Sequence, residues 1–178
     1  MKILKVIGLG IVGLIVLLLL VALIIPNDYT VSVSTTINKP KQVVFDYVKL
    51  IKNQENYSIW VMQDPNVNMD YQGTDGTVGF KASWDSKDDN VGAGSQQITT
   101  VSKERIDVDL HFVRPMKGEA KAGTLLDSIS ANETKVTSEF YGHSNYPMNL
   151  MNFVGEKFII DAQTKNLANL KKILESQP

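Results

Sequence analysis

The sequence predicts an α+β protein: a curved antiparallel sheet of about seven strands around one long C-terminal helix, preceded by one membrane-spanning helix. Three observations carry this prediction. An apolar run opens the chain, alternating segments fill its middle, and a long stretch of helical periodicity closes it. Each strand has one apolar face, and the closing helix is the one long amphipathic element that can cover these faces.

The first element is the apolar run, in which Val6 to Ile25 carry no charged or strongly polar side chain. Twenty such residues at about 1.5 Å per residue span about 30 Å, the thickness of the hydrocarbon core of a bilayer. The alternative is a cleaved signal peptide, whose apolar run is usually about 7–15 residues long and ends at a small-residue cleavage site. The stretch VALIIPNDY offers no such site. We therefore expect residues 1–25 to be an uncleaved signal anchor and residues 26–178 to be a separate domain.

The charges that flank this run predict its orientation. Lys2 and Lys5 precede it, whereas Asn27 and Asp28 follow it. Because cytoplasmic flanks of membrane helices carry the excess of Lys and Arg, we expect the N-terminus in the cytoplasm and the domain outside. The predicted location is the outer face of a bacterial cytoplasmic membrane, periplasmic or extracellular.

Composition excludes several classes of function. Residues 26–178 carry 16 Lys and Arg, the 18 of the chain less Lys2 and Lys5, against 19 Asp and Glu, which gives a net charge of −3. A domain without a basic footprint is not expected to bind nucleic acid. The chain has no cysteine, which excludes disulfides, a thiolate nucleophile, a cysteine-based metal site and a lipoprotein-type anchor.

The domain begins with a strand that passes directly into a helix. Residues 29–37, YTVSVSTTI, alternate as a half-buried strand does. Pro40 follows, and proline in a first helical turn loses no needed hydrogen bond. Helical spacing of apolar residues then continues to about Asn53. A second short helix is expected within residues 55–66, which carry Trp60 and end at Asp64-Pro65.

Six strands and the long helix complete the chain. From residue 67 the apolar period is two, and the clearest strand is RIDVDLHF, residues 105–112, with Ile106, Val108, Leu110 and Phe112 on one face. After Pro147 the period returns to 3.6, which predicts one helix over residues 149–175. A curved sheet that wraps a single helix holds its middle away from that helix, so a cavity between the two is expected.

This order of elements resembles a known superfamily. The early INKPKQVVFDYV, Trp60 and the closing LANLKKIL are similar to START/Bet v 1-like proteins, and more narrowly to the polyketide cyclase/dehydrase-type branch with an N-terminal membrane helix. The resemblance covers residues 29–175 and implies the helix-grip fold. Members bind lipids, sterols, polyketides or plant hormones, and others catalyse ring closures. They share no catalytic residue set, so the resemblance implies no catalytic residue here.

Motifs for metal, nucleotide or cofactor binding are not found in the sequence. His111 and His143 lie on different predicted strands without metal-ligand spacing. GAGSQQ is a glycine-rich turn and lacks the GxGxxG pattern. The charged strand residues are expected to form a cross-strand ladder on the outer face. In the reversed register they and Tyr141 would point inward and would be catalytic candidates. The charged residues are Asp107, Asp109, Glu119, Lys121 and Glu139.

The inner face of the sheet and its helix supply the candidate ligand-binding residues. Ligand pockets are mostly apolar and aromatic, although plain core packing is the alternative for each residue taken alone. Tyr146-Pro147-Met148, before the long helix, is the candidate lip of the cavity mouth. The candidates are Trp60, Tyr71, Phe80, Trp84, Val108, Leu110, Phe112, Phe140, Met148, Phe153 and Phe158.

The leading hypothesis is therefore a membrane-anchored domain, outside the cytoplasm, that binds a hydrophobic small molecule, lipid-like or polyketide-like. One alternative is a cyclase- or dehydratase-type enzyme on an apolar substrate, which requires an inward carboxylate, histidine or tyrosine. Another is a protein-interaction domain whose core is filled.

Overall fold

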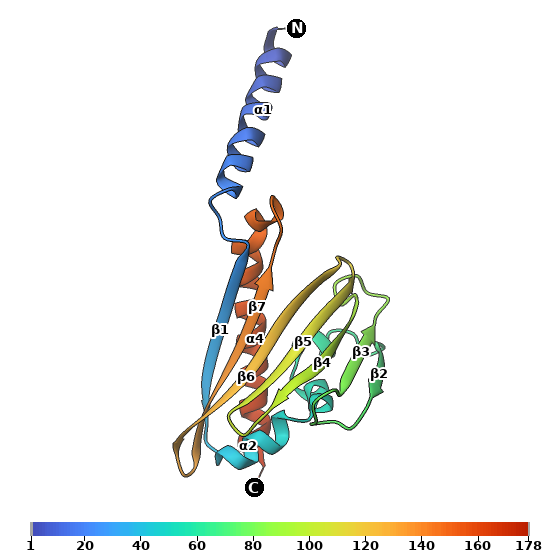
Figure 1. Cartoon of the computed structure of the whole chain (residues 1–178), viewed down its shortest axis with the longest axis vertical. Helices are drawn as coiled ribbons and strands as arrows, with labels where there is room; N and C mark the ends of the chain where they lie inside the picture. Colours follow the sequence, from blue (N-terminus) through green and yellow to red (C-terminus); the bar gives the residue numbers. More distant parts are fainter. Residues whose placement is uncertain (1, 178) are drawn as a thin grey trace.

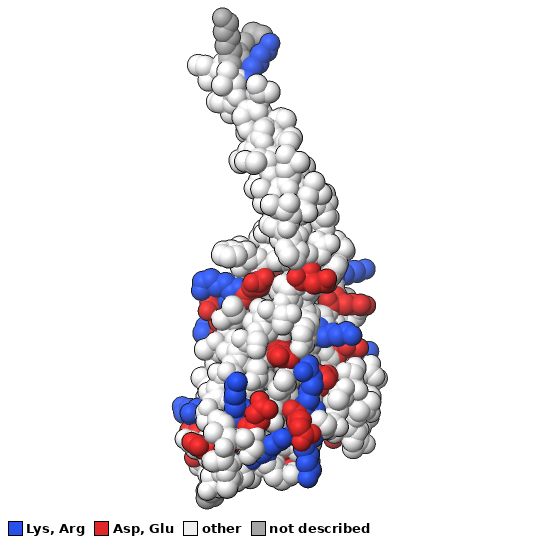
Figure 2. All heavy atoms as spheres, turned by 60° about the vertical axis from the view of Figure 1, so that its left-hand side comes forward, with Lys and Arg blue, Asp and Glu red and all other residues white. Residues whose placement is uncertain are grey.

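The computed structural model describes residues 2–177 and begins with a helix that stands apart from the domain. Helix α1 (Lys2–Ala22) projects from one end of the molecule (Figure 1). Its residues Ile3–Ala22 have a mean hydropathy of 2.9 and are long and apolar enough to cross a membrane. A signal sequence near the N-terminus can also reach this length and hydropathy. Lys, Arg, Asp and Glu side chains cover the domain but not the middle of α1 (Figure 2).

The rest of the chain forms one α+β domain, which confirms the predicted fold class. Its seven strands make a single antiparallel sheet in the order β1-β7-β6-β5-β4-β3-β2. The elements are β1 (Asp28–Ile37), α2 (Lys41–Val48), the 3-10 helix η1 (Ile51–Asn56), α3 (Ile59–Met62), β2 (Asn68–Gln72), β3 (Lys81–Asp85), β4 (Ala93–Val101), β5 (Arg105–Arg114), β6 (Gly118–Ser130), β7 (Glu133–His143), the 3-10 helix η2 (Met148–Met151) and α4 (Asn152–Ser176).

Two helix boundaries differ from the prediction. Helix α2 ends at Val48 rather than near Asn53 because the carboxylate of Asp75 accepts the N–H groups of Ile51 and Lys52, at 2.8 and 3.1 Å. Those are N–H groups that a continuing helix would bond to its own carbonyls. The long helix begins at Asn152 rather than residue 149, because η2 forms a 3-10 turn before it.

The strand register decides which side chains face α4. Val31, Phe140, Ala122, Val108 and Ile98 lie side by side in one row across five strands. Because side chains alternate along a strand, Ile106, Leu110 and Phe112 share the face of Val108. The predicted inward face of residues 105–112 is therefore confirmed.

The buried core lies in the half of the domain far from α1. Helix α4 packs along β1 and β7 (Figure 1) and buries Leu167, Leu170 and Leu174 there. They belong to a cluster completed by Ile37, Val44, Phe45, Val48, Ile106, Leu126 and Val136. A second cluster lies under β3, β4 and β5 and contains Ile51, Phe80, Ala82, Ile98 and Val108. Both clusters sit toward the ends of the strands that are distant from α1.

Candidate functional site

The half of the inner face nearer α1 is apolar but not closed. Trp84, Leu110, Phe112, Ala120 and Phe140 point inward from β3, β5, β6 and β7, and each is only partly buried. We call these five residues the open inner face. Helix α4 packs mainly on β1, at one edge of the sheet, so it leaves the inward side chains of β3, β5 and β6 incompletely covered.

Aromatic contacts organise this surface. The rings of Trp84 and Phe112 meet edge to face with centroids 6.1 Å apart, and Phe140 lies 6.1 Å from Tyr29. Gly94 lies between Trp84 and Phe112 in the sheet. A Cβ atom on Gly94 would lie 2.5 Å from Cζ2 of Trp84 and 2.6 Å from the carbonyl oxygen of His111. Glycine at this position therefore lets the indole lie against the sheet.

The structure distributes the eleven predicted ligand-binding residues over three places. Phe80 and Val108 are buried in the second cluster, where Tyr71 stacks on Phe80 with centroids 6.0 Å apart. Four others, Trp84, Leu110, Phe112 and Phe140, lie on the open inner face. Trp60, on α3, packs edge to face against Phe158 at 5.1 Å. As ligand contacts, all of them remain predictions.

For three of the eleven, the expected inward position is wrong. Met148, Phe153 and Phe158 are 55%, 83% and 63% exposed. The reason is that the buried stripe of α4 begins later, with Ala162, Leu167 and Leu170, whereas its first turns lie at the α1 end of the domain (Figure 1). Helical periodicity identifies an apolar stripe but does not say where the surface that covers it stops.

Titratable groups that face the inside are tyrosines. Partial burial and the hydrogen bond that its hydroxyl donates to Glu55 raise the pKa of Tyr71 above its usual value. Burial, with a smaller effect from Glu156, raises the pKa of Tyr29. Both phenols therefore stay protonated at neutral pH. Within the part of the chain that the structure describes, inward-facing strand positions carry no Asp, Glu or His.

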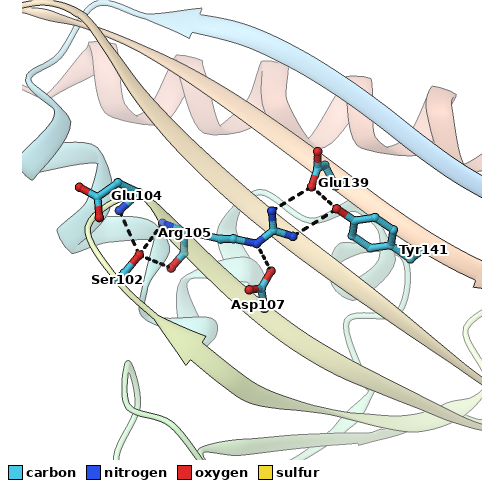
Figure 3. A network of polar contacts seen from close by, with 6 residues as sticks. All are labelled: Ser102, Glu104, Arg105, Asp107, Glu139 and Tyr141. Atoms are coloured by element: carbon cyan, nitrogen blue, oxygen red, sulfur yellow. Dashed lines mark hydrogen bonds and ion pairs between the residues drawn. The ribbon is translucent and has the colours of Figure 1, made fainter.

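The most connected polar cluster lies on the opposite, outer face of the sheet, centred on Arg105 (Figure 3). Asp107, Gly123 and Glu139 form one row across β5, β6 and β7. Arg105 Nε donates to Asp107 Oδ1 at 2.6 Å, and its Nη1 lies 3.3 Å from Glu139 Oε2. A Cβ atom on Gly123 would lie 2.8 Å from Arg105 Nη2, so this glycine leaves room for the guanidinium between the two carboxylates.

Tyr141 completes the network. Arg105 Nη2 donates to its hydroxyl at 3.2 Å, and that hydroxyl donates to the Glu139 carboxylate. The hydrogen bonds to Tyr141 and Asp107 raise the pKa of Arg105. The outward position predicted for Asp107, Glu139 and Tyr141 is thus confirmed, but the central role of Arg105 was missed. The signal was Gly123, the one residue without a side chain in a charged row.

This network has the features of a structural ion-pair network that links β5 to β7 across the sheet. Its one cation faces two carboxylates, and each of its groups is already hydrogen-bonded. A hollow of about 320 Å³ lies beside it, lined by residues that include Thr99, Lys121 and Tyr141. Another hollow of about 250 Å³ lies between α2 and the turn at Lys103-Glu104. Neither hollow is lined by a residue of the open inner face.

The two histidines lie on β5 and β7, with β6 between them. His111 is on the outer face, with Nδ1 3.8 Å from Glu119 Oε1. His143 lies at the α1 end, with Nδ1 2.7 Å from Asp28 Oδ1 and Nε2 3.1 Å from Asn145 Oδ1, and these two partners raise the pKa of His143. Among residues 2–177, no three His, Asp or Glu side chains gather closely enough to hold a metal ion.

Comparisons with known proteins identify the fold but no close relative. No family model and no curated protein matches the chain. The Zhui aromatase/cyclase from Streptomyces sp. R1128 is 10% identical with a TM-score of 0.64, over 83% of this chain and 94% of that one. The di-domain ARO/CYC BexL from the BE-7585A biosynthetic pathway is 14% identical with a TM-score of 0.60, over 85% of this chain and 52% of that one.

A third solved structure, Ara h 8.0201, is 11% identical with a TM-score of 0.56, over 84% of this chain and 99% of that one. Identities this low carry the fold and not the chemistry. The chain therefore shares the fold of these three proteins, which is the helix-grip fold predicted from its sequence.

Proposed function

We propose that this chain is a membrane-anchored domain whose open inner face binds a hydrophobic small molecule, lipid-like or polyketide-like. One observation carries the proposal. The two core clusters fill most of the inner face far from α1, whereas Trp84, Phe112 and Phe140 belong to neither cluster and stay partly exposed, with Leu110 at the border against the second cluster.

A ligand on this surface would gain stability chiefly from apolar burial. Each Å² of apolar surface removed from water contributes about 25 cal/mol, and aromatic side chains offer large areas. Tyr29, whose ring lies 6.1 Å from that of Phe140, supplies a hydroxyl group on the same inner face. Apolar walls with a few polar groups are the usual composition of a small-molecule site.

The similar folds favour the same class of ligand. Two of them are named as aromatase/cyclases, one of these within a biosynthetic pathway. We propose binding rather than ring closure for this chain. The two inward tyrosines, Tyr29 and Tyr71, have raised pKa values and stay protonated, and the described inward strand positions bring no carboxylate or histidine toward the site. General acid–base catalysis needs such a group within hydrogen-bond reach of the substrate.

The proposed anchor is α1. Its length and hydropathy fit a bilayer span, and Lys2 and Lys5 precede the apolar run while Asp28 follows it. By the positive-inside rule, the domain would lie outside the cytoplasm and the N-terminus inside. An apolar ligand would then be drawn from, or delivered to, the adjacent bilayer.

Photolabelling of the full chain tests the proposal. The protein is reconstituted in phosphatidylcholine nanodiscs with palmitic acid that carries a diazirine, and labelled residues are mapped by mass spectrometry. Labels in α1 act as an internal control for the anchor. We expect further labels at Trp84, Phe112 and Phe140, which Trp84→Glu removes. The matched control, Ile129→Glu, changes an exposed apolar residue at the far end of the domain and should leave them in place. Labels confined to α1 would refute binding.

A further inference from the structure

The end of the domain beside α1 exposes a group of large apolar side chains, which we call the apolar rim. Its members come from the β7–α4 connection, η2 and the first turns of α4, and they are 46–83% exposed. Monomeric proteins rarely expose contiguous apolar patches, and those they do expose mark contacts with proteins or membranes. The apolar rim consists of Tyr146, Met148, Met151, Phe153, Val154 and Phe158.

All members of the rim except Phe158 lie in a stretch without charge. Between His143 and Glu156, the twelve residues 144–155 contain no Asp, Glu, Lys, Arg or His. The remainder of α4 is charged, with Glu156, Lys157 and Asp161 following at once. Charged side chains are costly inside a bilayer, and tyrosine is favoured at its interface. The sequence therefore changes from uncharged to charged at the position where α4 leaves the α1 end of the domain.

Two buried asparagines fix the rim to the end of α1. Asn149 is 1% exposed, and its Nδ2 donates to the carbonyl oxygens of Ala22 at 2.7 Å and Ile25 at 2.8 Å. Asn152 is 5% exposed and donates to the carbonyl oxygen of Pro26 at 3.1 Å. A helix leaves its last carbonyls without partners, so Asn149 satisfies one at the C-terminus of α1.

These bonds also determine the orientation of both amides. Because the partners are carbonyl oxygens, the NH₂ groups must face them, and the Oδ1 atoms of Asn149 and Asn152 are left buried without a hydrogen bond. The domain is thus clamped to α1 rather than tethered by a loose linker.

We propose that the apolar rim is a second membrane contact, which inserts into the interfacial layer of the leaflet where α1 ends. The partner is the lipid bilayer itself. The inference rests on the proposed anchor, since the clamp holds the rim beside the last residues of the span (Figure 1). Its consequence is that the α1 end of the domain, and with it the open inner face, is held at the lipid surface.

Single-cysteine variants of the full chain test this contact directly, because the chain has no cysteine of its own. Phe153→Cys, Leu14→Cys and Ile129→Cys are each labelled with nitrobenzoxadiazole and reconstituted in phosphatidylcholine nanodiscs. Quenching is then measured with lipids spin-labelled near the headgroup for positions 153 and 129, and with lipids spin-labelled deep in the acyl chain for position 14. Ile129 is a matched control, since it is 55% exposed and lies on the hairpin farthest from α1.

The expected result is strong quenching at position 153, several-fold above that at position 129. Quenching at position 14 reports the anchor, so its loss would refute the proposed anchoring, whereas loss at position 153 alone would refute the rim contact. A signal at position 153 that requires two copies per nanodisc would also refute it, since the rim would then be an interface between copies. Adding Asn149→Ala should lower quenching at position 153 and leave position 14 unchanged; unchanged quenching at both would contradict the clamp.

Discussion

Gly94→Ala tests how Trp84 is seated on the open inner face. The new methyl group would lie 2.5 Å from the indole and 2.6 Å from the carbonyl oxygen of His111. The carbonyl belongs to the paired strand β5 and cannot retreat without breaking the ladder, so the indole must move away from the sheet. Overpacking of this kind costs about 1–3 kcal/mol, offset by about 0.4–1 kcal/mol because alanine restricts the unfolded chain.

The expected net loss therefore lies between about 0 and about 2.6 kcal/mol and is about 1.3 kcal/mol at the midpoints. For a domain of this size, each kcal/mol lowers the melting temperature by about 2–4 °C. Thermal unfolding of the full chain in detergent, followed by near-ultraviolet circular dichroism, measures both the stability and the packing of the indole. Gly118→Ala is the matched control, because a Cβ atom there meets nothing within 4 Å. If Gly94→Ala matches the wild type in melting temperature and in indole signal, Trp84 does not lie against Gly94.

Three further predictions concern the core, the outer network and the pH dependence. Leu174 is fully buried, so Leu174→Ala should lower the free energy of unfolding by about 2–5 kcal/mol in a denaturant titration. The control Met116→Ala changes a residue that is 73% exposed and should alter this free energy by less than about 0.5 kcal/mol. Equal effects of the two substitutions would contradict the assigned core. Arg105→Ala leaves the carboxylates of Asp107 and Glu139 without their cation. Because these sites are partly exposed, the substitution should lower the free energy of unfolding by about 1 kcal/mol and leave diazirine labelling of the inner face unchanged. Loss of that labelling would mean that the network serves binding. The raised pKa of His143 implies stabilisation that is complete below the ordinary pKa of 6.5 and is lost as the pH rises through the folded-state pKa. The unfolding midpoint should fall over that interval in the wild type and fall less in His143→Gln; identical pH profiles would exclude the contribution.

The strands could be predicted from sequence because one physical rule controls them. Side chains alternate with a period of two, and a shift by one residue would turn every apolar side chain of a half-buried strand to solvent. The pattern Ile106, Val108, Leu110 and Phe112 was therefore sufficient to place residues 105–112 correctly. It also placed Asp107 on the outer face.

The contacts of α4 could not be predicted in the same way. Periodicity assigned Phe153, Val154 and Phe158 to the covered stripe, but they lie beyond the surface that β1 and β7 provide. Conversely, Asn149 and Asn152 are polar and yet buried, because their partners are carbonyl groups at the end of α1, more than a hundred residues away in sequence. The available signal was a pair of asparagines three residues apart in an uncharged stretch.

Native mass spectrometry of the full chain, purified from membranes and released from detergent in the spectrometer, tests the central claim most directly. The account predicts a reproducible additional mass of an apolar small molecule on the wild type, reduced in Trp84→Glu and Phe112→Glu and unchanged in Ile129→Glu. If the wild type carries no such mass, or the additional mass is equal in all variants, the open inner face is not a binding site and the claim is contradicted.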